Sequence, residues 1–109
     1  MTTITIFKSG NGNYKRILCE GHAEFAKPGR DIVCSAVSML VINTINSLDE
    51  LLKVPMQVDS DEEKGLIDCQ FTENLDGKGR LLVDSMILGL EGVVSQYGRK
   101  YLKLKFKEV

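Results

Sequence analysis

The sequence predicts an α+β fold, a two-layer sandwich in which two long helices cover one largely antiparallel sheet of about five strands. Short stretches in which apolar and polar residues alternate indicate strands, whereas two longer stretches repeat apolar residues every three or four positions and indicate helices. The predicted order is strand, strand, helix, strand, strand, helix, strand. The length of 109 residues fits a single domain over residues 1–109 with one hydrophobic core.

The first two strands are expected to pair as a hairpin. Residues 3–8 alternate between two faces and are rich in β-branched side chains. Residues 9–13, Ser-Gly-Asn-Gly-Asn, tolerate the positive φ angles that a hairpin turn requires. Residues 14–20 are the expected returning strand, and a polar loop over residues 21–30 follows.

The first helix is expected over residues 32–53, where apolar residues recur at spacings of three, four and seven. Asp31 is a suitable N-cap, and Pro55 ends the helix because the residue before proline avoids helical angles. The first four turns carry no charge, which indicates neighbours around most of the helix. Two short β-strands are the alternative interpretation, since the stretch is rich in valine and isoleucine.

A second hairpin is expected from residues 54–58 and 66–71, joined by an acidic loop that is interpreted as a solvated turn. The second helix is expected over residues 80–97. Its glycines Gly89 and Gly92 lie on one face and would let another element approach closely.

Residues 101–107 are the expected last strand. Its inward side chains are predicted to be Leu102, Leu104 and Phe106. The lysines that alternate with them indicate a solvated face and not an RNA-binding stripe, because no aromatic platform lies beside them. The formal net charge of −1 also argues against a protein that coats a phosphate backbone, so no direct nucleic-acid binding is expected.

The three cysteines form no C-x-x-C pair, and their odd number indicates free thiols in the reducing cytoplasm. A zinc site made by Cys19, His22, Cys34 and Cys69 is disfavoured because no two ligands have the usual close spacing. We therefore expect neither a metal nor a cofactor. The longest uncharged run, residues 32–48, contains several polar residues and is interpreted as a core helix and not as a membrane anchor.

One segment combines residue types that can carry out nucleophilic catalysis: Gly21-His22-Ala23, seven loop residues, and then Asp-Ile-Val-Cys-Ser-Ala-Val-Ser over residues 31–38. If Asp31 is the N-cap, Cys34 lies in the first helical turn, where the helix dipole stabilises anions. His22, the only histidine, can take the thiol proton and later protonate a leaving amine.

Supporting roles are predicted for two further residues of the segment and for the backbone. Asp31 either caps the helix or orients the imidazole of His22, and Ser38 shares the helix face of Cys34. The backbone N–H of Cys34, with a loop N–H, is the candidate oxyanion hole. The competing interpretation is structural, because a buried cysteine is often a small hydrophobe and a loop histidine is often merely solvated.

The order and spacing of this segment resemble the Prp family of ribosomal-processing cysteine proteases. The resemblance implies a bacterial cytoplasmic endopeptidase, usually a homodimer, that removes an N-terminal extension from a large-subunit ribosomal protein by cutting after an aromatic pair. It places the catalytic histidine on His22 and the nucleophile on Cys34, and Gly21, Asp31 and Ser38 also match motif positions. The alternative function is a non-catalytic ribosome-associated binding module that keeps the scaffold.

The loop over residues 21–30 carries the candidate base and has little apolar content beyond Phe25. We expect this loop to be mobile without substrate and to close over a bound peptide. Phe25 is then a candidate substrate-binding residue.

Overall fold

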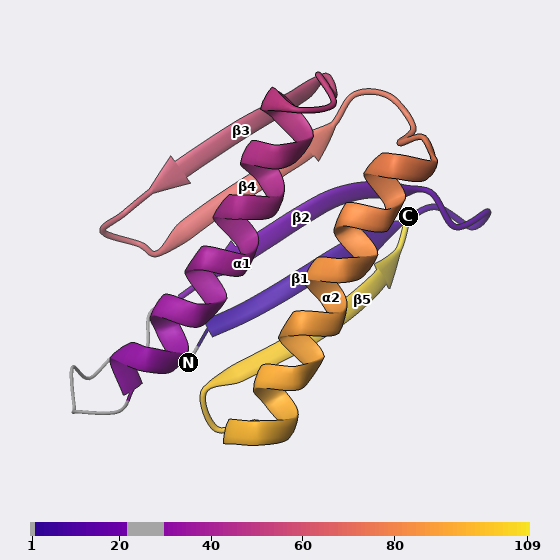
Figure 1. Ribbon diagram of the computed structural model, residues 1–109. Helices are drawn as coiled ribbons and strands as arrows, with labels where there is room; N and C mark the ends of the chain where they lie inside the picture. The colour runs from indigo at the N-terminus through magenta and orange to yellow at the C-terminus, as the bar shows by residue number, and fades with distance from the viewer. Residues whose placement is uncertain (1, 22–29) are drawn as a thin grey trace.

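The computed structural model describes residues 2–21 and 30–109, and the side chains of Arg30 and Asp31 are outside this description. Five strands and two helices follow one another in the order that the sequence predicts (Figure 1). The elements are β1 (Thr2–Lys8), β2 (Tyr14–Glu20), α1 (Arg30–Glu50), β3 (Met56–Asp61), β4 (Leu66–Phe71), α2 (Gly77–Tyr97) and β5 (Leu102–Glu108).

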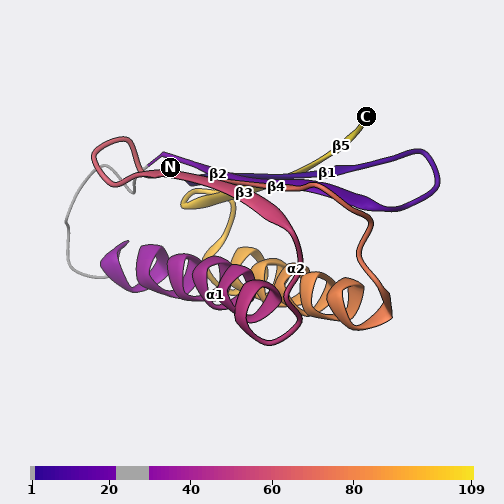
Figure 2. The ribbon, with the colours of Figure 1, turned by 90° about the horizontal axis from the view of Figure 1, so that it is seen from above.

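The strands form one sheet in the order β3-β4-β2-β1-β5. Three of the four pairings are antiparallel, whereas β5 runs parallel to β1. Both helices lie on the same side of this sheet, as Figure 2 shows from above. The two-layer α+β class and the largely antiparallel sheet are therefore confirmed, and the parallel edge pair arises because α2 carries the chain past β2 and β1 to the far edge.

The alternation of the strands places the core between the two layers. Ile4 of β1 lies opposite Cys19 of β2, and Ile17 lies opposite Cys69 of β4, all four on the face that the helices cover. On the opposite face Arg16 donates two hydrogen bonds of 2.8 and 2.7 Å to the carboxylate of Asp68, which ties β2 to β4. β2 is therefore held on both faces, by core packing on one and by the Arg16–Asp68 pair on the other.

α1 begins and ends earlier than expected. Because it starts at Arg30, Asp31 lies within the helix and is not its N-cap, which corrects the sequence prediction. It ends at Glu50 and not at Lys53, since Lys53 adopts a positive φ of 55° and Val54 N–H donates to Leu48 O. The alternative of two short strands is wrong.

Only one side of α1 faces the core. Val33, Val37, Val41 and Leu48 are buried, whereas Ile32, Met39 and Ile42 are exposed. The uncharged turns therefore have neighbours on one side within the described chain, and not around most of the helix as predicted. The segment Ile32–Glu50 is long and apolar enough to cross a membrane, a criterion of length and composition that core helices also meet.

α2 begins at Gly77, before the predicted residue 80, because Asp76 caps it by accepting a 2.8 Å hydrogen bond from Gly79 N–H. Gly98, with φ 84°, follows its last residue. A Cβ on Gly89 would lie 3.1 Å from a methyl carbon of Leu40 on α1, so the predicted close approach is confirmed there. The prediction is wrong for Gly92, where a Cβ would meet nothing within 4 Å among the described residues.

The last strand is only partly covered. Leu102 is fully buried and Leu104 half-buried, but Phe106 is 53% exposed and is not the core residue that the alternation predicts. β5 is an edge strand, and Figure 2 shows its C-terminal end turning away from the helix layer. An alternating pattern gives the face of a side chain but not whether another element covers that face.

The contact between Gly89 and Leu40 can be tested with a matched pair of substitutions. Gly89→Val should lower the free energy of unfolding by about 1–3 kcal/mol more than Gly92→Val, because only the first forces side-chain atoms into α1. Both variants introduce the same β-branched residue into the same helix, so the helix-propensity effect cancels. Urea unfolding followed by circular dichroism measures the difference. Equal destabilisation by the two substitutions would contradict close packing at Gly89.

Candidate active site

Three of the sequence-predicted site residues, Gly21, Cys34 and Ser38, line one cavity of about 380 Å³. The cavity lies where residues 34–46 of α1 meet the end of β2 and the hairpin of β3 and β4. Its full lining is Thr2, Cys19, Gly21, Cys34, Ser38, Ile42, Ile45, Asn46, Val58, Ser60, Asp61, Glu62, Gly65, Leu66 and Ile67.

The rotation of α1 explains why Cys34 faces this cavity. Val33 and Val37 are buried in the core, and Cys34 and Ser38 directly follow them. One residue along a helix turns the side chain by about 100°, so the thiol and hydroxyl leave the core face and reach its edge. Both residues are half-buried, and their spacing of four places them one turn apart on the same face.

The start of α1 changes the expected role of the helix terminus. With the first residue at Arg30, Cys34 lies in the second turn and not at the third helical position. The free backbone N–H groups of a helix belong to its first turn. The N–H of Cys34 is therefore not one of them, and the dipole acts on the sulfur from a greater distance than the sequence prediction assumed.

The remaining candidates fall on residues or side chains outside the described part of the chain. His22 and Phe25 lie outside the described residues, as does the predicted closure of the loop that carries them. The side chain of Asp31 is also outside the description. Gly21, the chain neighbour of His22, has φ 89° and lines the cavity, so the chain leaves β2 at the edge of the cavity that contains Cys34.

The three thiols differ in accessibility. Cys19 is 5% exposed, and its burial, with smaller contributions from Cys34 and Glu20, raises the pKa of its thiol to about 11. Cys69 is fully buried, and burial raises the pKa of its thiol to about 12. Both stay protonated near neutral pH. Cys34 is only half-buried and is the most accessible of the three sulfurs.

Two acidic residues at the cavity were missed in the sequence. Asp61 and Glu62 belong to the loop that was interpreted as a solvated turn, yet both line the same cavity as Cys34. Asp61 also accepts hydrogen bonds from the N–H groups of Glu63 and Lys64, which holds the turn in shape. The run of acidic residues was the available signal, but its distance from Cys34 along the sequence hid the proximity.

The walls of the cavity are largely apolar, formed by Ile42, Ile45, Val58, Leu66 and Ile67. An apolar cavity with one accessible thiol and an acidic end suits an extended peptide with apolar and basic side chains. Among residues 2–21 and 30–109 no group of three or more metal-ligating side chains could hold a metal ion. The disfavoured zinc set includes His22, which is outside these residues.

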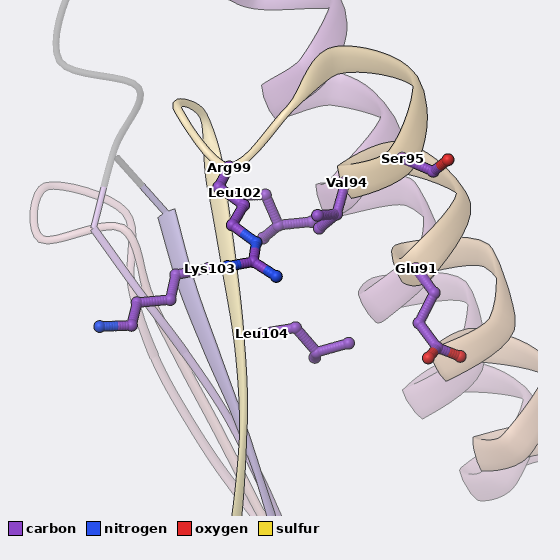
Figure 3. Close-up of a pocket in the computed structure, with 7 residues that line it drawn as sticks. All are labelled: Glu91, Val94, Ser95, Arg99, Leu102, Lys103 and Leu104. Atoms are coloured by element: carbon purple, nitrogen blue, oxygen red, sulfur yellow. The ribbon is translucent and has the colours of Figure 1, made fainter.

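A second cavity of about 610 Å³ lies between the C-terminal part of α2 and the start of β5 (Figure 3). It is lined by Glu91, Val94, Ser95, Arg99, Leu102, Lys103 and Leu104. In Figure 3 the side chain of Lys103 points away from the others, and Arg99 and Leu104 extend between strand and helix. No cysteine lines this cavity, so the nucleophile chemistry belongs to the first one.

Comparisons with known proteins identify the family of this chain. The sequence profile of the family described as cysteine protease Prp matches residues 1–103. The ribosomal processing cysteine protease Prp of Bacillus subtilis is 32% identical over 101 residues, covering 89% of this chain and 90% of that protein. Its namesake from Staphylococcus aureus is 22% identical, covering 98% of this chain and all of that protein.

Solved structures are similar over nearly the whole chain. The S. aureus protease Prp in complex with a substrate peptide has a TM-score of 0.88 at 20% identity, covering 98% of this chain and 100% of the other. The protein SMU.848 of Streptococcus mutans has a TM-score of 0.87 at 26% identity, covering 100% of this chain and 96% of the other. From the profile match and the Bacillus relative together, the chain belongs to the Prp family of cysteine proteases.

Proposed function

We propose that this chain is a cysteine endopeptidase that removes the N-terminal extension of a large-subunit ribosomal protein, with Cys34 as its nucleophile. The position of Cys34 carries the proposal, because it is the accessible thiol of the chain and lies in a peptide-sized cavity. Relatives named ribosomal processing cysteine protease support the class of substrate, and a similar structure holds a substrate peptide.

The mechanism uses the thiol of Cys34, the imidazole of His22 and the carbonyl group of the substrate's amide bond. The sulfur of Cys34 attacks the carbonyl carbon, and the C–N bond breaks to leave a thioester on the enzyme. His22 takes the thiol proton and delivers it to the leaving amine, which cannot depart as an anion. A water molecule, deprotonated by the same imidazole, then releases the acyl part and restores the thiol.

Four further residues assist the pair of Cys34 and His22. Ser38 lies one turn beyond Cys34 on the wall of the cavity and can donate a hydrogen bond to a bound peptide carbonyl. Gly21 brings the chain from β2 to the cavity edge directly before His22. Asp31 is the supporting residue that orients the imidazole of His22, and Phe25 is the residue that contacts the substrate.

The lining of the cavity suits the expected substrate. Its apolar walls can accept the aromatic pair that precedes the cleaved bond, since aromatic side chains bury large apolar areas. Asp61 and Glu62 give the cavity an acidic end that attracts basic residues, and ribosomal proteins are rich in these.

We further propose a cytoplasmic homodimer without membrane or nucleic-acid partners. The exposed side of α1 supports association with a second copy, because Ile32 and Met39 are apolar and exposed there. Leu88 of the neighbouring α2 is also exposed. Analytical ultracentrifugation of the reduced chain tests this: a sedimentation coefficient of a monomer at micromolar concentration would contradict it.

Cys34→Ser should fold normally but lose cleavage of a ribosomal-protein precursor, because a serine hydroxyl is far less acidic than a thiol. We expect the rate to fall by about 10³-fold or more. Ser35→Ala, an exposed neighbour on the same helix, should keep the wild-type rate. Mass spectrometry of the products measures both. Retained cleavage by Cys34→Ser, purified free of wild type, would place the nucleophile elsewhere.

His22→Ala should abolish turnover while only slowing alkylation of Cys34 by iodoacetamide. Alkylation needs a thiolate alone, whereas peptide cleavage also needs a proton for the leaving amine. Peptide mapping of the alkylated chain separates Cys34 from Cys19 and Cys69, which serve as buried internal references. Equal, slow labelling of all three thiols in the wild type would favour a binding module over a protease.

A further inference from the structure

A second thiol lies on the wall of the cavity that contains the nucleophile. Cys19, near the end of β2, and Cys34, in α1, both line the cavity of about 380 Å³, although they come from opposite layers of the fold. The mechanism above uses Cys34 alone, so it leaves Cys19 without a chemical role.

The environment of Cys19 separates it from the third cysteine. Cys69 lies on β4 opposite Ile17 and Val58, where its thiol donates to the sulfur of Met56 at 3.8 Å, and it does not line the cavity. After burial, Cys34 is a further cause of the raised pKa of the Cys19 thiol, as expected for two thiols that line one cavity. Such an influence does not extend to Cys69, whose charged neighbours are Asp68 and Asp49.

We propose that Cys19 is the resolving thiol of Cys34, so that oxidation by a hydroperoxide converts the pair into a reversible disulfide that blocks the nucleophile. This rests on the proposed function only for its consequence, the loss of protease activity. The formation of the bond itself depends on the two thiols and their shared cavity.

The chemistry has two balanced steps. The Cys34 thiolate attacks hydrogen peroxide, the O–O bond breaks, and the products are a sulfenic acid on Cys34 and, after protonation of the leaving hydroxide, water. The Cys19 sulfur then attacks the sulfenic sulfur, the S–O bond breaks, and the Cys19 proton leaves with the hydroxyl as a second water. The two thiols are thereby oxidised by two electrons and one peroxide is reduced.

Burial of Cys19 assigns the two roles. A thiol with a pKa of about 11 is protonated near neutral pH and does not react with peroxide on its own. It reacts instead with the sulfenic acid that forms in the same cavity, a step in which its proton leaves with the departing hydroxyl and which needs no access from solvent. The half-buried Cys34 is thus the sulfur that is oxidised first and Cys19 the one that resolves it.

A disulfide also places a limit on the backbone. The Cα atoms of Cys19 and Cys34 must lie within about 4.4–6.8 Å of each other in a disulfide. The start of α1 and the end of β2 must therefore be this close in the oxidised chain. The Cys34 sulfur is then bonded and cannot attack a carbonyl. A dithiol such as dithiothreitol reverses the bond by exchange.

The test begins with the unmodified chain. The reduced protein is treated with hydrogen peroxide, the remaining thiols are alkylated, and the digest is mapped without reductant. The expected result is a linked peptide pair containing Cys19 and Cys34, with Cys69 alkylated. A linkage through Cys69, or a Cys34 sulfenic or sulfinic acid with Cys19 still alkylated, would overturn the proposal whether or not the chain is a protease.

Two variants give a second readout in the same experiment. After peroxide and then dithiothreitol, the wild type and Cys69→Ala should recover their cleavage activity. Cys19→Ala should recover about threefold less, because without a resolving thiol the sulfenic acid proceeds to the irreversible sulfinic acid. Circular dichroism checks that each variant is folded. Equal recovery by folded Cys19→Ala and wild type would overturn the protective role of Cys19.

Discussion

The packing of α1 against the sheet is the interaction on which the rest of the site depends. Val33, Val37, Val41 and Leu48 enter the core as one stripe, and this stripe determines the rotation of the helix. Cys34 and Ser38 each follow a residue of the stripe, so the same contacts that stabilise the fold also turn the thiol and the hydroxyl toward the cavity. A rotation of the helix by one residue would bury Cys34 and expose the core valines.

The cavity combines three chemical environments because three parts of the chain meet there. α1 supplies the accessible thiol, the end of β2 supplies Gly21 and Cys19, and the β3–β4 hairpin supplies the acidic residues. The burial of Cys19 and the accessibility of Cys34 give the two sulfurs different reactivity within one cavity. Burial thus decides which thiol is a nucleophile, and the sheet register that places Cys19 opposite Ile4 and Ile67 decides how deeply it lies.

Much of the fold follows from local patterns in the sequence. The bounds of β2 and β4 agree with the predicted strands. Alternation within a strand and the turn residues next to it define these bounds, and both are found within a few positions of the sequence. The start of α2 was missed because Asp76 caps it through the N–H of Gly79, a contact that the stripe of apolar residues does not reveal. The exposure of Phe106 and the parallel pairing of β5 depend on which strand is at the edge, which is a property of the whole sheet.

The site was predictable only where its residues are close in sequence. Gly21, Cys34 and Ser38 belong to one motif and meet in one cavity. Asp61 and Glu62 reach the same cavity from a distant hairpin, and no spacing rule links them to Cys34. Cys19 was predicted only to be a free thiol, because its place in the cavity that contains Cys34 depends on the stacking of helix over sheet.

The proposed mechanism requires a covalent bond between Cys34 and the substrate, and trapping that bond is its direct test. The reduced chain is mixed with an excess of a peptide that spans the processing site, quenched in acid within the first turnover, and mapped by mass spectrometry. We expect a thioester on the peptide that contains Cys34, carrying the part of the substrate that precedes the cleaved bond. Cleavage products without any adduct on Cys34, or an adduct on Cys19 or Cys69, would contradict it.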